Sequence, residues 1–288
     1  MADSGPDGPT DGRGAPSGTA PVLAVLPCAD PWRAWVADVA AHAPVLDVLA
    51  RKDFQTRYKR ASLGVLWVVA LPLLQAVVLA FVFSRVARFD TSGSYTVFVM
   101  GGMFTWSYLS STVQSATTAV VDGASLADKV WFPRVVLVLV PVVANVVGLL
   151  VSFAVLTITV PIVGDWTGWR MLLLAPAALL LVALTLGLSL VLSALHVYFR
   201  DTRFIVQAAL LVTLYLTPVI YPAELLGRWE GWLDLNPATG VVELVHTATT
   251  GSDAPGRSLV VSLVAAVALL AGGAAVHRQR DRLFIDQL

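Results

Sequence analysis

The sequence of 288 residues is 57% hydrophobic and only 13% charged, and its mean hydropathy is +0.77. A soluble domain carries about 25% charged residues, so this composition excludes a water-soluble enzyme and indicates a protein embedded in lipid. Nineteen Lys and Arg balance nineteen Asp and Glu, so the net charge does not point to nucleic acid. The single cysteine, Cys28, excludes an internal disulfide framework and a multi-cysteine metal site.

The chain starts with a segment, residues 1–30, that is rich in Gly and Pro and poor in large apolar side chains. Such a segment cannot bury enough surface to order itself, so we predict a disordered cytoplasmic tail. Its acidic start, with Asp3 and Asp7, is not that of a signal peptide.

Residues 31–60 combine aromatic and apolar side chains with a basic cluster that ends in Arg57, Tyr58, Lys59 and Arg60. This pattern predicts a pair of amphipathic helices that lie on the inner leaflet of a membrane. Ordinary basic flanking of a first membrane span is the alternative, and it explains the charges but not the spacing of the aromatic residues.

Six stretches of the chain contain no Asp, Glu, Lys or Arg: 61–84, 91–121, 135–164, 171–199, 204–223 and 258–277. Each has at least 20 residues, and about 20 helical residues cross a hydrocarbon core of ~30 Å. A segment in lipid must satisfy its own backbone hydrogen bonds, which favours helices here. The predicted fold class is therefore an all-α integral membrane protein with six transmembrane helices.

The basic residues between these stretches are distributed unevenly. Five lie on one side of the predicted membrane: Arg85, Arg88, Arg170, Arg228 and Arg257. Twelve lie on the other: Arg51, Lys52, Arg57, Lys59, Arg60, Lys129, Arg134, Arg200, Arg203, Arg278, Arg280 and Arg282. Because cytoplasmic loops carry the excess of Lys and Arg, both termini are predicted to be cytoplasmic.

The cytoplasmic loop between the second and third stretches has the features of a short helix. Ser125 precedes Asp128 by three residues, which is the spacing of an N-terminal cap, and Pro133 limits the other end. A helix of about two turns is predicted to expose Lys129, Val130, Trp131 and Phe132, and exposed aromatic side chains beside a cation are suited to docking a soluble partner. The alternative is a loop whose aromatic side chains dip into the lipid headgroups.

The outer connection, residues 222–257, contains two apolar pieces that are too short to span a membrane, separated by Asn236 and Pro237. They are predicted to form a re-entrant helical hairpin that folds back into the outer half of the membrane. The alternative is a pair of helices that lie flat on the outer leaflet, anchored by Trp229 and Trp232.

Signals of catalysis and of ion coupling are missing. None of the six stretches contains an ionisable Asp, Glu, Lys or Arg, which disfavours coupling to an ion gradient. The sequence has no phosphate-binding Gly-x-x-x-x-Gly-Lys loop, so any ATP must bind to another subunit. The four histidines are scattered, which disfavours a metal site.

Five strings, in this order, carry a resemblance to a known family. They are FQTRYKRASLGVLW at 54–67, KVWFPR at 129–134, YFRDTR at 198–203, TPVIYP at 217–222 and LNP at 235–237. Together they resemble the membrane subunit of type-2 ATP-binding-cassette exporters, in the branch that exports O-antigen, teichoic acid, galactan and related polysaccharides. The resemblance covers residues 45–288.

The resemblance implies a permease, not an enzyme, in the bacterial cytoplasmic membrane, with residues 61–288 as its six-helix domain. It implies a homodimer with two copies of a separate ATPase, which binds the ATP and Mg, so that this chain itself binds no cofactor or metal. The expected coupling residues, at 125–134, are Ser125, Asp128, Lys129, Trp131, Phe132, Pro133 and Arg134. The expected gate residues for a lipid-linked sugar diphosphate are Arg57, Tyr58, Lys59 and Arg60. The expected outer-hairpin residues are Tyr221, Pro222, Asn236, Pro237 and Glu243.

A path for a sugar chain is expected to be lined by aromatic faces, which stack on sugar rings without one fixed hydrogen-bond pattern. The candidates in the first two stretches are Trp67, Phe81, Phe83, Phe104, Trp106 and Tyr108. An exporter of a small hydrophobic drug or lipid with the same fold is the alternative. A membrane transferase is disfavoured because its possible acids, Asp201 and Glu243, lie on opposite sides of the predicted membrane.

Overall fold

The computed structural model describes residues 31–59, 64–86, 94–127, 131–164 and 166–280, and in these ranges the chain forms helices and turns without any strand. The predicted all-α fold is therefore confirmed for this part of the chain. The predicted tail, residues 1–30, and the predicted site residues Arg60, Asp128 and Lys129 lie outside the described residues.

Each of the six uncharged stretches contains a helix: α3 (Trp67–Val86), α4 (Tyr95–Asp122), α6 (Val135–Val163), α7 (Leu174–Tyr198), α8 (Thr202–Tyr215) and α11 (Arg257–Arg280). In the described part, three helical segments are long and apolar enough to cross a membrane: Val135–Val163, Gly168–Tyr198 and Arg257–Gln279. The segments Trp67–Phe83 and Thr202–Tyr215 are shorter apolar helices. Many Ser and Thr residues interrupt the apolar sequence of α4, although its 28 residues are enough to span.

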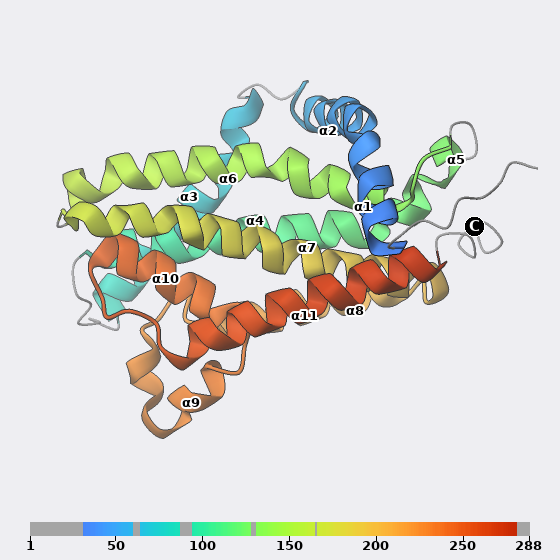
Figure 1. Ribbon diagram of the computed structural model, residues 1–288. Helices are drawn as coiled ribbons and strands as arrows, with labels where there is room; N and C mark the ends of the chain where they lie inside the picture. The colour runs from blue at the N-terminus through green and yellow to red at the C-terminus, as the bar shows by residue number, and fades with distance from the viewer. Residues whose placement is uncertain (1–30, 60–63, 87–93, 128–130, 165, 281–288) are drawn as a thin grey trace, which may run out of the picture.

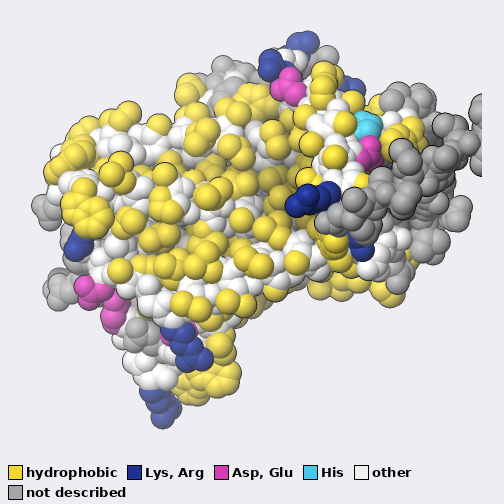
Figure 2. Space-filling model, in the orientation of Figure 1, with side chains coloured by type: hydrophobic (Ala, Val, Ile, Leu, Met, Phe, Trp, Pro, Cys, Tyr) yellow, Lys and Arg dark blue, Asp and Glu magenta, His cyan; other side chains and the backbone are white. Residues whose placement is uncertain are grey.

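The long helices form one elongated bundle (Figure 1). α4 packs against α3, α6 and α7, and α11 packs along α7. Toward one end of the bundle lie α1 (Pro31–Ala41), α2 (Ala43–Tyr58) and α5 (Ala124–Ala127), together with the end of α11. Toward the other end lie η2 (Gly168–Leu173), η3 (Ala223–Trp229), α9 (Glu230–Leu233) and α10 (Thr239–Thr250). In Figure 2 the side of the bundle is mostly hydrophobic and the charged side chains gather toward its ends, as a membrane requires.

The fifth uncharged stretch is only partly helical. α8 ends at Tyr215, where Leu216 closes the helix with bonds from its amide to the carbonyls of Val212 and Thr213, at 3.2 and 3.1 Å. The prediction of one helix through residues 204–223 is wrong in its last third, because Pro218 has no amide hydrogen and disfavours helical angles at Thr217. Residues 216–222 instead form a turn that folds back onto α4.

The outer connection forms η3, α9 and α10. All residues of α10 except Glu243 are buried, among α4, α7 and α11. The alternative in which both pieces lie flat on an outer surface is therefore wrong for the second piece, since protein covers it. Trp229 and Trp232 of the first piece are exposed.

Candidate functional site

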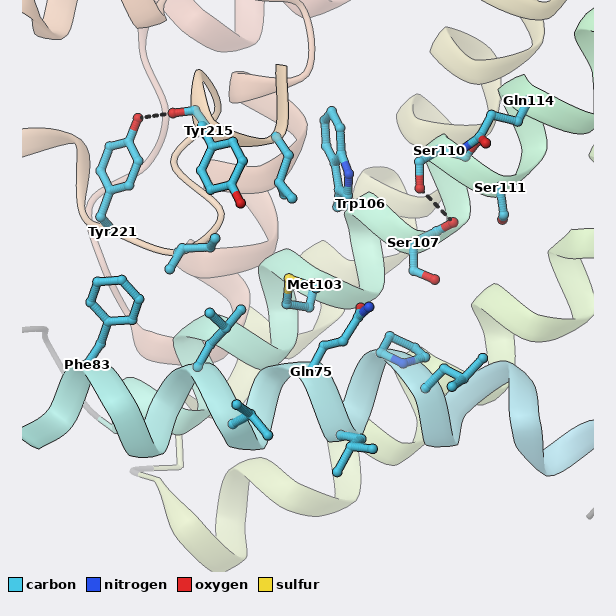
Figure 3. Close-up of a pocket in the computed structure, with 17 residues that line it drawn as sticks. Gln75, Phe83, Met103, Trp106, Ser107, Ser110, Ser111, Gln114, Tyr215 and Tyr221 are labelled. Atoms are coloured by element: carbon cyan, nitrogen blue, oxygen red, sulfur yellow. Dashed lines mark hydrogen bonds between the residues drawn. The ribbon is translucent and has the colours of Figure 1, made fainter. Parts of the chain in front are cut away.

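A cavity of about 930 Å³ lies between α3, α4 and α8, and the turn after α8 contributes to its wall (Figure 3). We call it the main cavity. Its lining includes Gln75 and Phe83 from α3, Tyr215 from α8 and Tyr221 from the turn. The Tyr221 hydroxyl donates to the Tyr215 carbonyl at 2.7 Å, which holds the two aromatic residues side by side.

The α4 wall of the main cavity carries a row of hydroxyl and amide side chains, which we call the α4 polar row: Ser107, Ser110, Ser111 and Gln114. A spacing of three or four residues puts them on one helix face. Ser110 and Gln114 donate to the carbonyls of Ser107 and Ser110, at 3.4 and 3.1 Å, and their oxygens can still accept further bonds. None of the described residues that line the main cavity is Asp, Glu, Lys or Arg. The lining is therefore uncharged and mostly apolar, with aliphatic and aromatic side chains, and the α4 polar row supplies much of its polar part.

A second, narrower cavity of about 190 Å³ lies beside the main cavity, toward α6, and we call it the neck cavity. The two cavities share Leu71, Pro72, Ser107 and Ser111, so they adjoin one another. The other polar and aromatic side chains of the neck cavity are Arg57, Trp67, Phe104, Tyr108, Asn145 and Ser152.

The structure brings most of the predicted aromatic residues to the main cavity and the neck cavity. Phe83 and Trp106 line the main cavity, and Trp67, Phe104 and Tyr108 line the neck cavity. Phe81 lines neither of them and is 64% exposed on α3. Sequence reasoning missed the α4 polar row and Tyr215. The helical spacing of Ser107, Ser110 and Gln114 in an uncharged stretch was the available signal.

A third cavity, of about 470 Å³, lies between α2, α4 and α6, and we call it the α2 cavity. Of the predicted gate residues, Arg57 lines both this cavity and the neck cavity. Tyr58 is the last residue of α2, and Lys59 follows it as an exposed C-cap, with its amide bonded to the Gln55 carbonyl at 2.8 Å. The predicted gate residues thus meet the cavities through Arg57.

The predicted coupling helix begins earlier than its sequence suggested. α4 extends to Asp122 and Gly123 closes it, with its amide bonded to the Ala119 carbonyl at 3.0 Å. α5 then starts at Ala124, so Ser125 lies inside it and does not cap it, and the capping prediction is wrong. Its described part is one turn, and Trp131 to Pro133 are not helical.

The residues after α5 divide between the surface and the interior. Trp131 is 71% exposed, and its ring lies 5.7 Å from that of His42, between centroids, at the junction of α1 and α2. Phe132, Pro133 and Arg134 are buried, so the prediction that Phe132 is presented to a partner is wrong. It is wrong because α2 folds over the start of α6.

One apolar cluster joins this turn to α2. Phe132, Val136 and Leu137 form its core, and Val45 and Leu46 of α2 and Leu126 of α5 pack against them. The cluster therefore joins α5 and the start of α6 to α2, the helix that carries Arg57.

The predicted outer residues meet at the other end of the bundle. The Asn236 amide donates to Thr217 Oγ1 at 2.8 Å, and its oxygen accepts from the Ala238 amide at 3.0 Å. The Pro237 carbonyl accepts from Ser262 Oγ at 2.6 Å, and Glu243 accepts a short bond from Ser258. Pro222 and Glu243 line one polar pocket. The Asn236 bond holds the turn after α8 against the segment that precedes α10. The bonds of Pro237 and Glu243 hold that segment and α10 against α11.

The described residues contain no group of three or more His, Cys, Asp or Glu side chains that could hold a metal ion. The bundle and its apolar flanks define a multi-pass helical membrane protein with cavities between its helices.

Comparison with known proteins identifies the family. The ABC-2 type transporter family matches residues 45–249, and the chain belongs to this family. The O-antigen export system permease protein RfbA of Klebsiella pneumoniae is 30% identical over 204 residues, which cover 69% of this chain and 77% of that protein. The protein of the same name from Myxococcus xanthus is 26% identical over 257 residues, which cover 88% of this chain and 98% of that protein. The family match runs from α2 to α10 and thus includes all three cavities.

Proposed function

We infer that this chain is the permease subunit of an ATP-driven exporter that moves lipid-linked cell-surface polysaccharide across a membrane. The observation that carries this inference is the uncharged lining of the main cavity, where aromatic side chains and the hydroxyl and amide groups of the α4 polar row lie among aliphatic side chains. O-antigen is the polysaccharide class that the names of the relatives support.

This lining suits a sugar chain that must slide through the main cavity without being held at one position. Aromatic rings stack on the apolar faces of sugar rings, and hydroxyl and amide groups can exchange one sugar hydroxyl for the next. A fixed charge would hold one position too strongly, and none lines the main cavity among the described residues. The relatives that match this chain are named for O-antigen export, which disfavours the alternative of a small hydrophobic drug or lipid.

The energy source in this proposal is a separate ATPase subunit, present in two copies and carrying the ATP and Mg. We propose that α5, Trp131 and the undescribed residues Asp128 and Lys129 dock on it. Exposed aromatic side chains beside a cation are typical anchors of protein interfaces. ATP-driven closure would move α5, and the Phe132 cluster would pass that movement to α2 as a rigid-body shift.

The proposed assembly is a homodimer. α3 and α8, which flank the main cavity, carry exposed apolar side chains that include Leu74, Val78, Leu211 and Val212. A second copy packed on these faces would cover them and close the cavity into a path. The helices α3, α4, α6, α7 and α11, and α8 together with the turn that follows it, would span the bacterial cytoplasmic membrane, with both termini cytoplasmic. The buried α10 would form the re-entrant part of the outer hairpin, surrounded by protein as its depth requires.

The proposed gate for the lipid-linked substrate is Arg57, with Tyr58, Lys59 and Arg60 next to it. A guanidinium group pairs in a bidentate manner with phosphate oxygens, so Arg57 suits the diphosphate that joins the lipid to the glycan. Its position at two cavities supports this role.

The test is to reconstitute the chain with its ATPase in liposomes and to measure ATP hydrolysis with polyprenyl-diphosphate-linked glycan, the polyprenyl lipid alone, or a hydrophobic drug. Stimulation by the lipid-linked glycan and not by the lipid alone is expected. Stimulation by the drug or the bare lipid alone would overturn the polysaccharide assignment in favour of the alternative. Failure to bind any ATPase would overturn the proposed role as a permease subunit.

A further inference from the structure

A polar cavity of about 760 Å³ lies at the end of the bundle where η3 and α10 lie, and we call it the outer pocket. The turn after α8, the helix α10 and the segment 251–258, which leads into α11, form most of its wall. Ile220 and Tyr221 of the turn line the main cavity, whereas Pro218 and Pro222 of the same turn line the outer pocket. One turn thus borders both cavities.

The outer pocket differs from the main cavity in its charge. Five charged side chains line it: Glu224, Asp234, Glu243, Asp253 and Arg257. Glu243 accepts a bond from Ser258, and the other four make no side-chain hydrogen bond or ion pair with any described residue. Asp234 and Glu243 are half-buried, so their carboxylates are partly removed from water. These groups have hydrogen-bonding capacity that the protein itself does not use.

A buried imidazole also lines the outer pocket. His246 of α10 stacks on Phe98 of α4, with ring centroids 3.8 Å apart, and both residues belong to the lining. His246 is 3% exposed, and its Nε2 has no hydrogen-bond partner among the described residues. Buried polar atoms are rarely left without a partner, so this nitrogen indicates a place for a polar group of another molecule.

The lining favours a ligand with many hydroxyl groups. Carboxylates accept from hydroxyl groups, a guanidinium donates to them, and a volume of about 300–1,000 Å³ is usual for a ligand pocket. The acids of the described chain do not gather in a group of three that could hold a metal ion. Four acids against one Arg disfavour an anion such as a phospholipid headgroup. An uncharged sugar unit meets all of these conditions.

We propose that the outer pocket is a glycan-binding subsite, which holds uncharged sugar units of a chain that has left the main cavity. This inference rests on the proposed function, since it takes the exported glycan as the ligand. Hydrogen bonds to ionised groups are about twice as strong as those between neutral groups. The uncharged main cavity therefore lets the chain slide, and the charged outer pocket holds it.

The experiment measures occupancy at the pocket itself, from the reactivity of one introduced thiol. In the full complex of permease and ATPase, the permease carries Cys28→Ser, which removes its single natural thiol, and Ser252→Cys in the lining. A membrane-impermeant maleimide labels the complex in nanodiscs, and labelling of the permease is measured. The probe is the glycan of the lipid-linked substrate, released from its lipid by mild acid. Gly231→Cys is the matched control, since Gly231 is exposed outside the lining and a Cβ there meets no atom within 4 Å.

The released glycan is expected to slow the labelling of Ser252→Cys in a saturable manner and to leave the labelling of Gly231→Cys unchanged. Asp234→Asn is expected to raise the glycan concentration for half-maximal protection by about three- to tenfold, because a hydrogen bond to a charged group is lost. Glu224→Gln, at a more exposed position, should raise it less. Asp201→Asn removes the same charge from an exposed residue outside the pocket and should leave it unchanged.

Unchanged labelling of Ser252→Cys in the presence of the glycan would overturn the subsite, and protection by CaCl₂ in its place would assign the pocket to a cation. An equal glycan requirement in Asp234→Asn, Glu224→Gln and Asp201→Asn would overturn the role of the carboxylates. In either case the proposed function stands if lipid-linked glycan stimulates ATP hydrolysis in the wild-type complex, and it fails if that stimulation is absent. Thermal unfolding of each complex separates lost binding from lost folding, and Glu224→Gln tests the carboxylates if Asp234→Asn does not assemble.

Discussion

The contact between α7 and α11 and the space between α3, α4 and α8 are built from similarly uncharged helices, but one is closed and the other is open. Gly187 and Gly273 let α7 and α11 approach so closely that a Cβ on Gly273 would lie 2.5 Å from Leu190 Cβ, and one on Gly187 would lie 2.8 Å from Leu269 Cβ. The main cavity is instead lined by large side chains, among them Trp106, Phe83 and Tyr215, at positions where only small residues would let α3, α4 and α8 pack closely. Small residues at a helix contact allow backbone packing in lipid, and large ones at an open face leave a space.

The comparison shows that the absence of charge does not by itself separate supporting helices from the helices of the site, whereas the polar residues within an uncharged helix do. α7 and α11 are strongly apolar and hold the bundle together. α4 is interrupted by polar residues, and this helix provides the wall of the cavity.

The largest expected effect comes from forcing the closed contact apart. Gly273→Val would put branched carbon atoms against Leu190 and Val191, and overpacking of this kind costs about 1–3 kcal/mol or more. We expect a lower midpoint of thermal unfolding in detergent. Gly272→Val is the matched control, since a Cβ there meets no atom within 4 Å. Equal unfolding midpoints for the two variants would contradict the close packing of α7 on α11.

A smaller effect is expected at the end where α5 lies. Trp131→Ala should weaken ATPase binding by about 1–2 kcal/mol, as truncation of an aromatic anchor does, and leave the fold intact. Pull-down titration of the ATPase measures this change. Trp169→Ala, at a residue that is 73% exposed near the other end, is the control. Unchanged ATPase affinity in Trp131→Ala would refute the docking role of this turn.

At the other end of the open space, Asn236 fastens the turn after α8. Asn236→Ala removes the bonds to Thr217 Oγ1 and to the Ala238 amide and should cost about 1–2 kcal/mol of stability. A shift in the thermal unfolding midpoint would report it, with the exposed Gln279→Ala as the reference. No shift relative to that reference would mean that these bonds do not hold the outer end of the cavity.

The smallest effect on stability, and a clear one on transport, is expected inside the main cavity. Gln114→Leu should leave the unfolding midpoint unchanged and slow glycan export by about fivefold, the effect of losing roughly one hydrogen bond to the passing chain. Liposome export assays measure this rate. Thr157→Val, on the exposed face of α6, makes a similar polar-to-apolar change outside the cavity. Equal export rates in these two variants would remove the α4 polar row from the path.

The sequence alone was sufficient to predict a helix in each uncharged stretch, since a long run without charge must either cross lipid or be buried. It was not sufficient for helix ends. Ser125 has the spacing of a cap, but α4 runs on to Asp122 and moves the turn to Gly123. Phe132 has the character of an exposed anchor, and it is buried because Val45 and Leu46 come from another helix to cover it.

What the sequence by itself determined is the lipid environment, the helical class and the order of the helices, because charge and hydropathy act locally along the chain. What only the tertiary structure decided is which side chains share a space. Arg57 and Asn145 are 88 residues apart and meet because α2 lies across α6. Such pairings depend on how helices pack, and packing is set by the shapes of surfaces that are distant in the chain.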